Sequence, residues 1–548
     1  MRRRGPKGCA GGAPNVQEGG GFRKGGLPPL LMGPFDAIVV GGGLTGAGIA
    51  RDLAVRGASV LLLEKDDWGG GASSWMLHGD PRSLELDWDN ARLAREEAER
   101  IVAIAPHLVR RRAMLVPALP DERLPPLNGA IPHMRVGGVE ARRLEPGLSP
   151  HVTEALVLDE WTVDPLRLAW ANVLDAVRAG AVARNHSRVE ALLREGARVT
   201  GVRYRAADGS GAEVRARVVV NAAGPWAAGL GALADVHVPV RPARMVHLVF
   251  DRQLSDFAIS AESVDGGEVV LLPHGGVTLL GAAAADHYGD PDGAEAQPDD
   301  VDFLLQAAER VFPAVREHRP VRAVASVRAA LFQWRTPAGD LTRRFDVLDH
   351  ERRDGVPGLV SAIGGTLPLY RLCAERAADV ACGRIGVRAG GATAGRPLPG
   401  AGGAAPPARE LARDHGIPAL AAARLLGRHG CEAAEVLQDP RRGRLVCRCE
   451  ALTEAELVHA ARHEHVRSLA DAFRRVGLAA GPCAGAACVE RGAEVLGHEL
   501  GWDPSQRRDA CRAYQTAAWH DRAPVLDRWA WAQEELAYGL RRGWPGGL

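Results

Sequence analysis

The chain has 548 residues, of which 46% are hydrophobic and 25% charged. These values are typical of a globular protein, and the length indicates two or three domains. A net charge of +1 argues against a nucleic-acid reader, and no run of eighteen apolar residues predicts a membrane-spanning helix. The only lysines are Lys7, Lys24 and Lys65, which excludes a Schiff-base lysine in the later chain.

The first 34 residues begin MRRRGPKG and continue with glycine and proline instead of an apolar segment. They do not resemble a secretory signal. We expect a disordered leader, or sequence upstream of a start at Met32. Nine cysteines in such a chain indicate a reducing, cytoplasmic setting, where clustered thiols hold metal or do redox chemistry more often than they form disulfides.

Composition divides the remaining chain into five parts. A first block covers residues 35–387, and a glycine-, alanine- and proline-rich stretch at 388–408 is typical of a linker. A helical connector is expected over 409–445, a cysteine-bearing domain over 446–495, and a helical, tryptophan-rich tail over 496–548.

The first block opens with a nucleotide-binding pattern, DAIVVGGGLTGAGIARDLAVRGASVLLLEKD. Residues 37–40 read as a buried parallel strand, followed by a helix to about Val55 and a second strand at 59–63. Glu64 ends that strand, where an acid can accept a hydrogen bond from a ribose hydroxyl.

Three glycines between the first strand and the helix have G-x-G-x-x-G spacing. Gly41 permits a tight turn, Gly43 lets backbone approach a pyrophosphate, and Gly46 allows close packing of helix on strand. The helix N-terminus supplies N–H donors to the phosphates. Because strand, helix, second strand and acid are all in register, the pattern predicts a dinucleotide site.

Two later segments favour FAD as the dinucleotide. Residues 186–227 read as a short meander ending in a strand and a glycine turn at Gly224. Residues 358–370 form another strand that runs into Gly364 and Gly365 before a helix. Both are typical of strand-to-turn approaches to an extended cofactor, although ordinary turns of an α/β sheet would also fit.

The motifs GASSWMLHGDPRSLE, NAAGPW and IGGTLPLYR make the first block similar to the FAD-dependent glycerol-3-phosphate dehydrogenases, within the wider D-amino-acid-oxidase-like flavoproteins. The resemblance implies an α/β and α+β fold, with a Rossmann-like FAD domain and a substrate domain that covers the flavin. The residues it implies for FAD binding are Gly41, Gly43, Gly46, Glu64, Ser73, Ser74, Val189, Gly224, Gly364, Gly365 and Thr366.

The same resemblance implies a phosphorylated polyol as substrate. Arg82, Arg328 and Arg343 match motif positions where guanidinium groups grip phosphate oxygens. His247 matches a position that faces the substrate. His78 is the candidate base for the hydroxyl proton, although it could instead shape its loop by hydrogen bonding to backbone.

The chain departs from the family pattern at three places. Asp80 replaces a glycine, Ser83 replaces a tyrosine, and Thr366 stands where the family has a phosphate-facing lysine, with Pro368 and Leu369 also differing. Losing a buried cation costs phosphate binding about 2–5 kcal/mol. Glycerol 3-phosphate is therefore the leading substrate. The alternatives are an amine, amino-acid or opine dehydrogenase and a non-catalytic electron-relay subunit.

Four cysteines group in the C-terminal region, Cys447 and Cys449 in VCRCE and Cys483 and Cys488 in GPCAGAAC. Four thiolates on two loops can hold a [2Fe–2S] cluster, with zinc as the main alternative. The spacing resembles the small iron–sulfur domain of bacterioferritin-associated ferredoxin type, which the anaerobic members of the family carry after the flavin domain. Between the loops, Thr453 and Glu456 have the spacing of a capping box.

The resemblance further implies that electrons leave through the cluster to partner subunits or a membrane quinone. Any membrane contact, at the inner face, would be made through those partners. The aromatic side chains of the tail are expected to pack within the chain, with a partner surface as the alternative.

Overall fold

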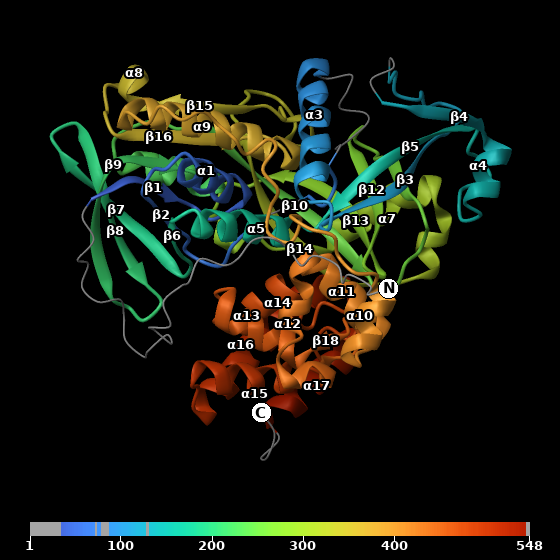
Figure 1. Cartoon of the computed structure of the whole chain (residues 1–548). Helices are drawn as coiled ribbons and strands as arrows, with labels where there is room; N and C mark the ends of the chain where they lie inside the picture. Colours follow the sequence, from blue (N-terminus) through green and yellow to red (C-terminus); the bar gives the residue numbers. More distant parts are fainter. Residues whose placement is uncertain (1–33, 72–73, 78–86, 128–130, 544–548) are drawn as a thin grey trace, which may run out of the picture.

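The structure is a computed structural model that describes residues 34–71, 74–77, 87–127 and 131–543 (Figure 1). The described chain forms two eight-stranded sheets that lie side by side in Figure 1, with a helical C-terminal part below them. Residues 1–33 of the expected leader lie outside the described residues.

The first sheet is built around β1 (Phe35–Val40), which pairs in parallel with β2 (Val60–Leu63) and β9 (Gly211–Asn221). The strand order is β15-β16-β9-β1-β2-β6, and β7 and β8 extend from β9 as an antiparallel meander. This confirms the strand–helix–strand prediction at the glycine motif and the meander predicted at 186–227. The remaining elements of this layer are α1 (Leu44–Val55), α5 (Pro165–Arg178), β6 (Val182–Arg184), β7 (Ser187–Glu195), β8 (Arg198–Ala206), α6 (Ala227–Ala232), β15 (Phe345–Asp349), α8 (His350–Asp354), β16 (Leu359–Gly364) and α9 (Tyr370–Ile385).

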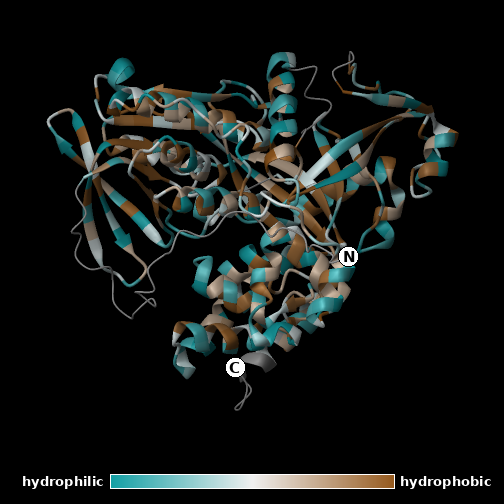
Figure 2. Cartoon of the chain, viewed as in Figure 1, coloured by the Kyte–Doolittle hydropathy of each residue, from teal (hydrophilic) through white to brown (hydrophobic). Residues whose placement is uncertain are grey.

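Helices α1, α5 and α9 cover one face of this sheet, and the meander with α6 packs on the other. Because both faces are covered, β1 is apolar and buried along almost its whole length. Figure 2 shows the same contrast, with hydrophobic residues concentrated in the strands and hydrophilic residues on outer helices such as α3.

The second sheet has the order β14-β10-β13-β12-β11-β3-β5-β4. The buried side of helix α7 (Pro298–Val311) packs against one face of this sheet. Most neighbouring strands are antiparallel, so one face is free to line a cavity while the other is covered. The other elements are α3 (Trp88–Ile104), β3 (Val109–Ala118), β4 (His133–Gly137), α4 (Gly138–Leu144), β5 (Glu154–Val163), β10 (Val240–Phe250), β11 (Ala258–Glu262), β12 (Glu268–His274), β13 (Val277–Asp286) and β14 (Pro320–Leu331).

The C-terminal part is helical around a short β17–β18 hairpin. The expectation that the aromatic side chains of its tail pack within the chain is met only in part: Tyr514 packs on the cysteine region and the rings of Trp519 and Trp531 lie 5.0 Å apart, whereas Trp529 is 81% exposed. Its elements are α10 (Ala408–His415), α11 (Ala419–His429), α12 (Ala433–Val436), β17 (Leu445–Cys447), β18 (Leu452–Thr453), α13 (Glu454–His463), α14 (Leu469–Val476), α15 (Val489–Leu500), α16 (Pro504–Arg522) and α17 (Arg528–Gly543).

Residues 388–408 are almost entirely irregular, in agreement with the composition, yet they are anchored to the first layer. Thr393 donates to Asp52, Arg396 forms an ion pair with Asp175, and Leu398 is buried. This segment therefore holds the C-terminal part against the nucleotide-binding layer rather than tethering it loosely.

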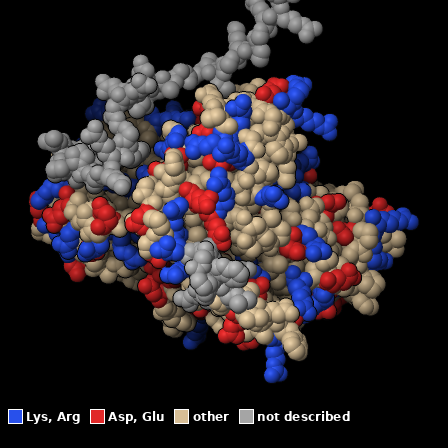
Figure 3. All heavy atoms as spheres, turned by 90° about the horizontal axis from the view of Figure 1, so that it is seen from below, with Lys and Arg blue, Asp and Glu red and all other residues tan. Residues whose placement is uncertain are grey.

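The face of the molecule that Figure 3 shows carries no large patch of like charge. Lys and Arg side chains are interspersed there with Asp and Glu, consistent with the net charge of +1. In the described part of the chain, no helix has both the length and the apolar character needed to cross a bilayer.

Candidate active site and cysteine centre

A cavity of about 1040 Å³ runs between the two sheets. The loop from β1 to α1 lines one region, and strands β10, β13 and β14 of the second sheet line another. An elongated ligand in this cavity would contact both layers at once.

The glycine loop is shaped for close approach of a ligand. Gly41 has φ of +108°, and a Cβ there would overlap the carbonyl of Ala222, the residue directly after β9. A Cβ at Gly46 would overlap the carbonyl of Gly41, whereas one at Gly43 would meet open space. Gly43 also lines the cavity, so its bare backbone is available to a phosphate.

Glu64 braces this loop from the end of β2. Its Oε2 accepts from the Gly42 N–H at 2.6 Å, and its Oε1 accepts from the Asp66 N–H at 2.8 Å. Burial raises the pKa of this carboxyl despite these two bonds. Each oxygen keeps a lone pair, so a ribose hydroxyl remains a possible donor to it.

His247 enters the cavity from β10 at an irregularity in the sheet. The pairing of β10 with β13 shifts register between Val246 and His247, and such a bulge re-aims a side chain. A Cβ at Gly281, the residue paired with His247 on β13, would overlap the imidazole. Burial lowers the pKa of His247 to about 4, so the ring is neutral near pH 7.

Two guanidinium groups, those of Arg328 and Arg343, line the cavity. Arg328, on β14, donates to the carbonyls of Leu341 and Thr342 at 3.2 and 2.7 Å, and Arg343 follows directly in the chain. Burial, and then repulsion from Arg343, lower the pKa of Arg328 to about 10. The guanidinium remains charged near pH 7, and an anion between the two cations would relieve their repulsion.

The turn after β16 presents Gly364, Gly365 and Thr366 to the cavity. The Thr366 hydroxyl is buried and has no hydrogen-bond partner among the described residues. Because buried polar groups are normally paired, this hydroxyl is placed to bond a ligand.

The four clustered cysteines meet as two pairs. The Sγ atoms of Cys449 and Cys483 are 3.8 Å apart, and the Cys488 thiol donates a hydrogen bond to Cys447. That bond lowers the pKa of Cys447 to about 6, with further help from the Glu450 and Ala479 N–H groups. All four residues are described, and no three of their sulfur atoms lie within 4.8 Å of one another.

A family model for the FAD dependent oxidoreductases matches residues 36–366. The chain belongs to this family. It is a flavoprotein whose cofactor is FAD, and it contains a second matched region, residues 391–507, corresponding to the C-terminal domain of alpha-glycerophosphate oxidase.

Similar proteins match most of the length of this flavoprotein. A protein named as one subunit of the anaerobic glycerol-3-phosphate dehydrogenase of Escherichia coli strain K12 is 34% identical over 476 residues, covering 84% of this chain and 88% of that protein. Its counterpart in Haemophilus influenzae is 30% identical over 513 residues, covering 91% and 90%. The structure of the glycerol-3-phosphate dehydrogenase from Bacillus halodurans complexed with FAD aligns with a TM-score of 0.74 at 23% identity, covering 90% of this chain and 96% of that one.

Most residues expected at the site of this flavoprotein line the cavity between the sheets. The residues that do so are Gly41, Gly43, Gly46, Glu64, Ser74, Val189, Gly224, His247, Arg328, Arg343, Gly364, Gly365 and Thr366. Ser73, His78, Asp80, Arg82 and Ser83 lie outside the described residues.

Two other cavity residues have no signal in the sequence. Trp75, from the loop after β2, lines the cavity and packs its ring against His274 at 4.6 Å. Arg474, from α14 of the C-terminal part, also lines it. Because α14 is far along the chain from every other lining segment, no local pattern could have placed Arg474 there.

The predicted capping box at α13 is only half formed. Thr453 accepts from the Glu456 N–H at 3.2 Å, as expected. The Glu456 carboxylate, however, pairs with Arg428 and His429 instead of returning to the Thr453 N–H. A buried guanidinium offers a carboxylate a stronger, charge-assisted bond than a neutral backbone N–H, so the tertiary contact wins.

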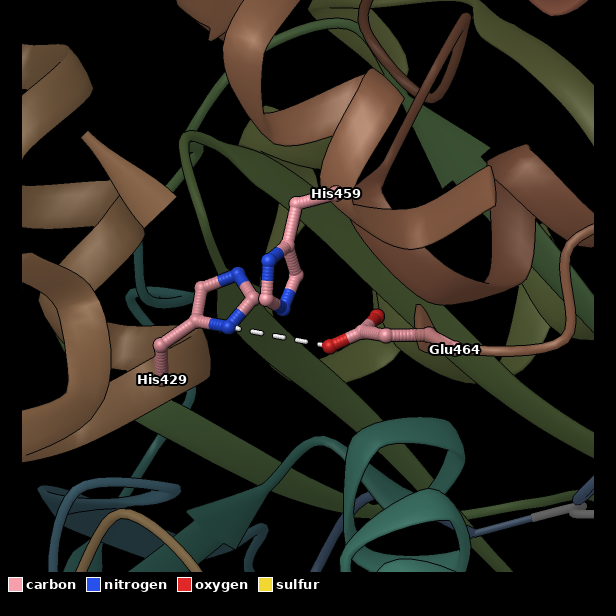
Figure 4. Close-up of side chains that lie close together, drawn as sticks. All are labelled: His429, His459 and Glu464. Carbon is pink, nitrogen blue, oxygen red and sulfur yellow. Dashed lines mark ion pairs between the residues drawn. The ribbon is translucent and has the colours of Figure 1, made fainter. Parts of the chain in front are cut away.

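His429 also belongs to a buried cluster with His459 and Glu464 (Figure 4). Their possible ligand atoms all lie within 4.8 Å of one another, and His429 Nδ1 is 3.6 Å from Glu464 Oε1. The Glu464 carboxylate already accepts two bonds from Arg167 of α5, at 2.7 and 3.3 Å. A metal ion here would face that guanidinium, so we interpret the cluster as an ion-pair network joining α5 to the C-terminal part.

Proposed function

We propose that this flavoprotein is a dehydrogenase that oxidises sn-glycerol 3-phosphate to dihydroxyacetone phosphate. The observation that carries the proposal is that a dinucleotide cradle and two arginines, Arg328 and Arg343, line the same cavity. The relatives named as glycerol-3-phosphate dehydrogenases support it, because they match nearly the whole chain.

The cavity fits FAD by three features of the chain. Gly43 leaves backbone open to a pyrophosphate, Glu64 stands at the ribose position, and Thr366 offers a buried hydroxyl without a partner among the described residues. Bound FAD supplies a two-electron acceptor that can release electrons singly.

In this proposal the substrate phosphate binds Arg328 and Arg343. The Arg328 guanidinium is desolvated, and the dianion offsets its repulsion from Arg343. Thr366 stands at the position where the family has a lysine that faces the phosphate. The phosphate is therefore bound by these two arginines together with Arg82, which lies outside the described residues. A neutral sugar alcohol brings no anion to these cations and is therefore selected against.

Oxidation of the alcohol requires the hydroxyl proton to leave as hydride departs from the carbinol carbon. His78 is the proposed proton acceptor, since imidazole titrates near neutral pH. The His247 imidazole is neutral and packs directly against Gly281, where a Cβ would not fit. It can therefore orient the substrate hydroxyl by a hydrogen bond without adding charge. With its low pKa, His247 is the weaker base of the two.

The cysteine pairs fit a [2Fe–2S] cluster better than zinc. A tetrahedral zinc site with Zn–S of about 2.3 Å holds all four sulfur atoms about 3.8 Å apart. In this protein the 3.8 Å spacing is found between the Sγ atoms of Cys449 and Cys483, whereas no three of the four sulfur atoms lie within 4.8 Å of one another. A binuclear cluster takes two thiolates on each iron and suits two separate pairs. Bound there, it would carry one electron at a time.

Electrons would then pass to partner proteins and on to a respiratory quinone. The relatives are named as single subunits of a larger enzyme, which supports a multi-subunit assembly. Any association with the cytoplasmic face of a membrane would be made through those partners.

A substrate panel tests the proposal. Holoprotein is mixed anaerobically with sn-glycerol 3-phosphate, glycerol, an amino acid or an opine, and flavin absorbance is followed. We expect rapid bleaching with sn-glycerol 3-phosphate alone. Bleaching by the amino acid or the opine instead would replace the proposal with the amine or opine dehydrogenase, and no bleaching with any compound would leave the electron-relay role.

A further inference from the structure

Among the described residues that line the cavity, Arg474 alone comes from the cysteine-bearing part of the chain. It lies in the last turns of α14 and lines the cavity together with Lys65, Asp66 and Arg188. Lys65 and Asp66 directly follow Glu64, just beyond β2, and the Arg474 charge acts on the neighbouring Asp67. Arg474 therefore lies at the end of the cavity where the adenosine half of a dinucleotide held by the glycine loop would bind.

The Arg474 guanidinium is only loosely engaged within the protein. Its Nη1 lies 3.9 Å from Asp471 Oδ1, beyond hydrogen-bond distance. The other oxygen of this carboxylate, Oδ2, accepts from His186 at 3.0 Å and from the Arg467 N–H at 2.9 Å, and Oδ1 accepts no hydrogen bond from any described residue, Arg474 included. The Arg474 side chain is 31% exposed, so its fork is free to turn towards a ligand in the cavity.

The helix that carries Arg474 is itself held firmly against the nucleotide layer. Arg475 donates to Asp67 at 2.7 Å and lies 4.7 Å above the ring of Trp170. Asn185 donates to the His465 carbonyl at 3.0 Å. The backbone that carries Arg474 is therefore already ordered, and only the side chain has to adjust when it binds a ligand.

We propose that Arg474 is an FAD-binding residue supplied by the C-terminal part, and that it contacts the adenosine diphosphate half of the cofactor. Its planar fork can donate to a phosphate or ribose oxygen or stack on the purine. Assembly of the C-terminal part on the nucleotide layer would therefore complete the FAD site. The inference rests on FAD as the cofactor and is independent of the substrate.

The test measures ligand binding to flavin-free full-length protein with Arg474 changed to Gln. Dissociation constants for FAD, ADP and FMN are compared with those of wild type and of Arg462→Gln, a matched change in α13 at a residue that pairs with Glu499 and does not line the cavity. We expect FAD and ADP to bind roughly tenfold more weakly to Arg474→Gln, with FMN binding unchanged. Arg474→Lys should recover part of the loss.

Two results would overturn the inference. Wild-type affinity of Arg474→Gln for both FAD and ADP would show that the side chain does not contact the cofactor. An equal loss for FAD, ADP and FMN, accompanied by a lower unfolding temperature of the flavin-free protein, would assign Arg474 a purely structural role. Neither readout depends on which compound is oxidised, so failure here is distinct from failure of the proposed activity.

Discussion

Arg475 Nη2 donates to Asp67 Oδ1 across 2.7 Å, and both side chains are fully buried. The pair joins α14, which leads into the cysteine region, to the segment that follows β2 and Glu64. Burial raises the pKa of Asp67, against the pull of Arg475. The carboxyl can therefore become neutral if it loses its partner, whereas the guanidinium cannot.

This asymmetry predicts unequal effects of removing either partner. Breaking a buried ion pair costs about 3–5 kcal/mol. We expect Asp67→Asn to reach that range, because it leaves a buried guanidinium uncompensated, and Arg475→Met to cost less at pH 6 than at pH 8, because Asp67 takes up a proton. Thermal unfolding of both variants at the two pH values measures this.

A matched surface variant, Arg462→Met, serves as the control, since its pair with Glu499 is partly exposed and worth little. Equal unfolding temperatures for Asp67→Asn and wild type would contradict the importance of this contact.

Features that depend on residues close together in the chain could be predicted from the sequence, whereas contacts between distant residues could not. Gly41, Gly43 and Gly46 are predictable because a tight turn and a close phosphate approach each require glycine at a fixed offset from the strand. The capping role of the Glu456 side chain was predicted wrongly, because Arg428, from another helix, offers a stronger bond than the local cap. Asp67 and Arg475 could not be paired from sequence, since they meet only when residues 408 positions apart fold together.

Changing Gly281 to Ala tests the placement of His247. An added Cβ would overlap the imidazole, so the ring or the strand must move. A displacement of about 1 Å at a reacting group can lower turnover roughly 100-fold. We expect such a loss in steady-state turnover with unchanged FAD content. Gly293→Ala, where a Cβ would meet open space, should keep wild-type turnover, and equal turnover in both variants would show that His247 need not be fixed.

Acid should destabilise the fold through two half-buried histidines, His459 and His465. Burial lowers the pKa of His459 and of His465 to about 4, against about 6.5 in an unfolded chain. The unfolded state thus binds protons first, and stability is full above pH 6.5 and falls as the pH drops towards 4. At pH 5 each of these two histidines lowers the free energy of unfolding by about 2 kcal/mol relative to neutral pH.

Replacing His459 with Gln should reduce the drop in unfolding temperature between pH 7 and pH 5. His498→Gln is the control, because that side chain is 82% exposed and should leave the drop unchanged. A drop of the same size in His459→Gln as in wild type would mean that His459 is already charged in the fold.

The pairing of the cysteines predicts which thiols hold iron. Cys449→Ser and Cys483→Ser each remove one member of the same pair, and we expect both to lower iron and sulfide from about two atoms of each per chain. Cys511→Ala should retain them, since this buried thiol is not one of the four proposed ligands. Metal analysis that finds zinc instead of iron in anaerobically purified wild type would refute the cluster.

The central claim is that one chain both oxidises a phosphorylated alcohol and passes the electrons on one at a time. A substrate titration of wild type and of an Arg328 variant tests this claim most directly. Anaerobic holoprotein would be titrated with sn-glycerol 3-phosphate while flavin absorbance and the electron paramagnetic resonance signal of iron are recorded, in wild type and in Arg328→Gln. We predict flavin bleaching together with an iron signal in wild type, and a substrate requirement at least roughly tenfold higher in the variant. Oxidised flavin and no iron signal at saturating substrate in the wild type would contradict that central claim.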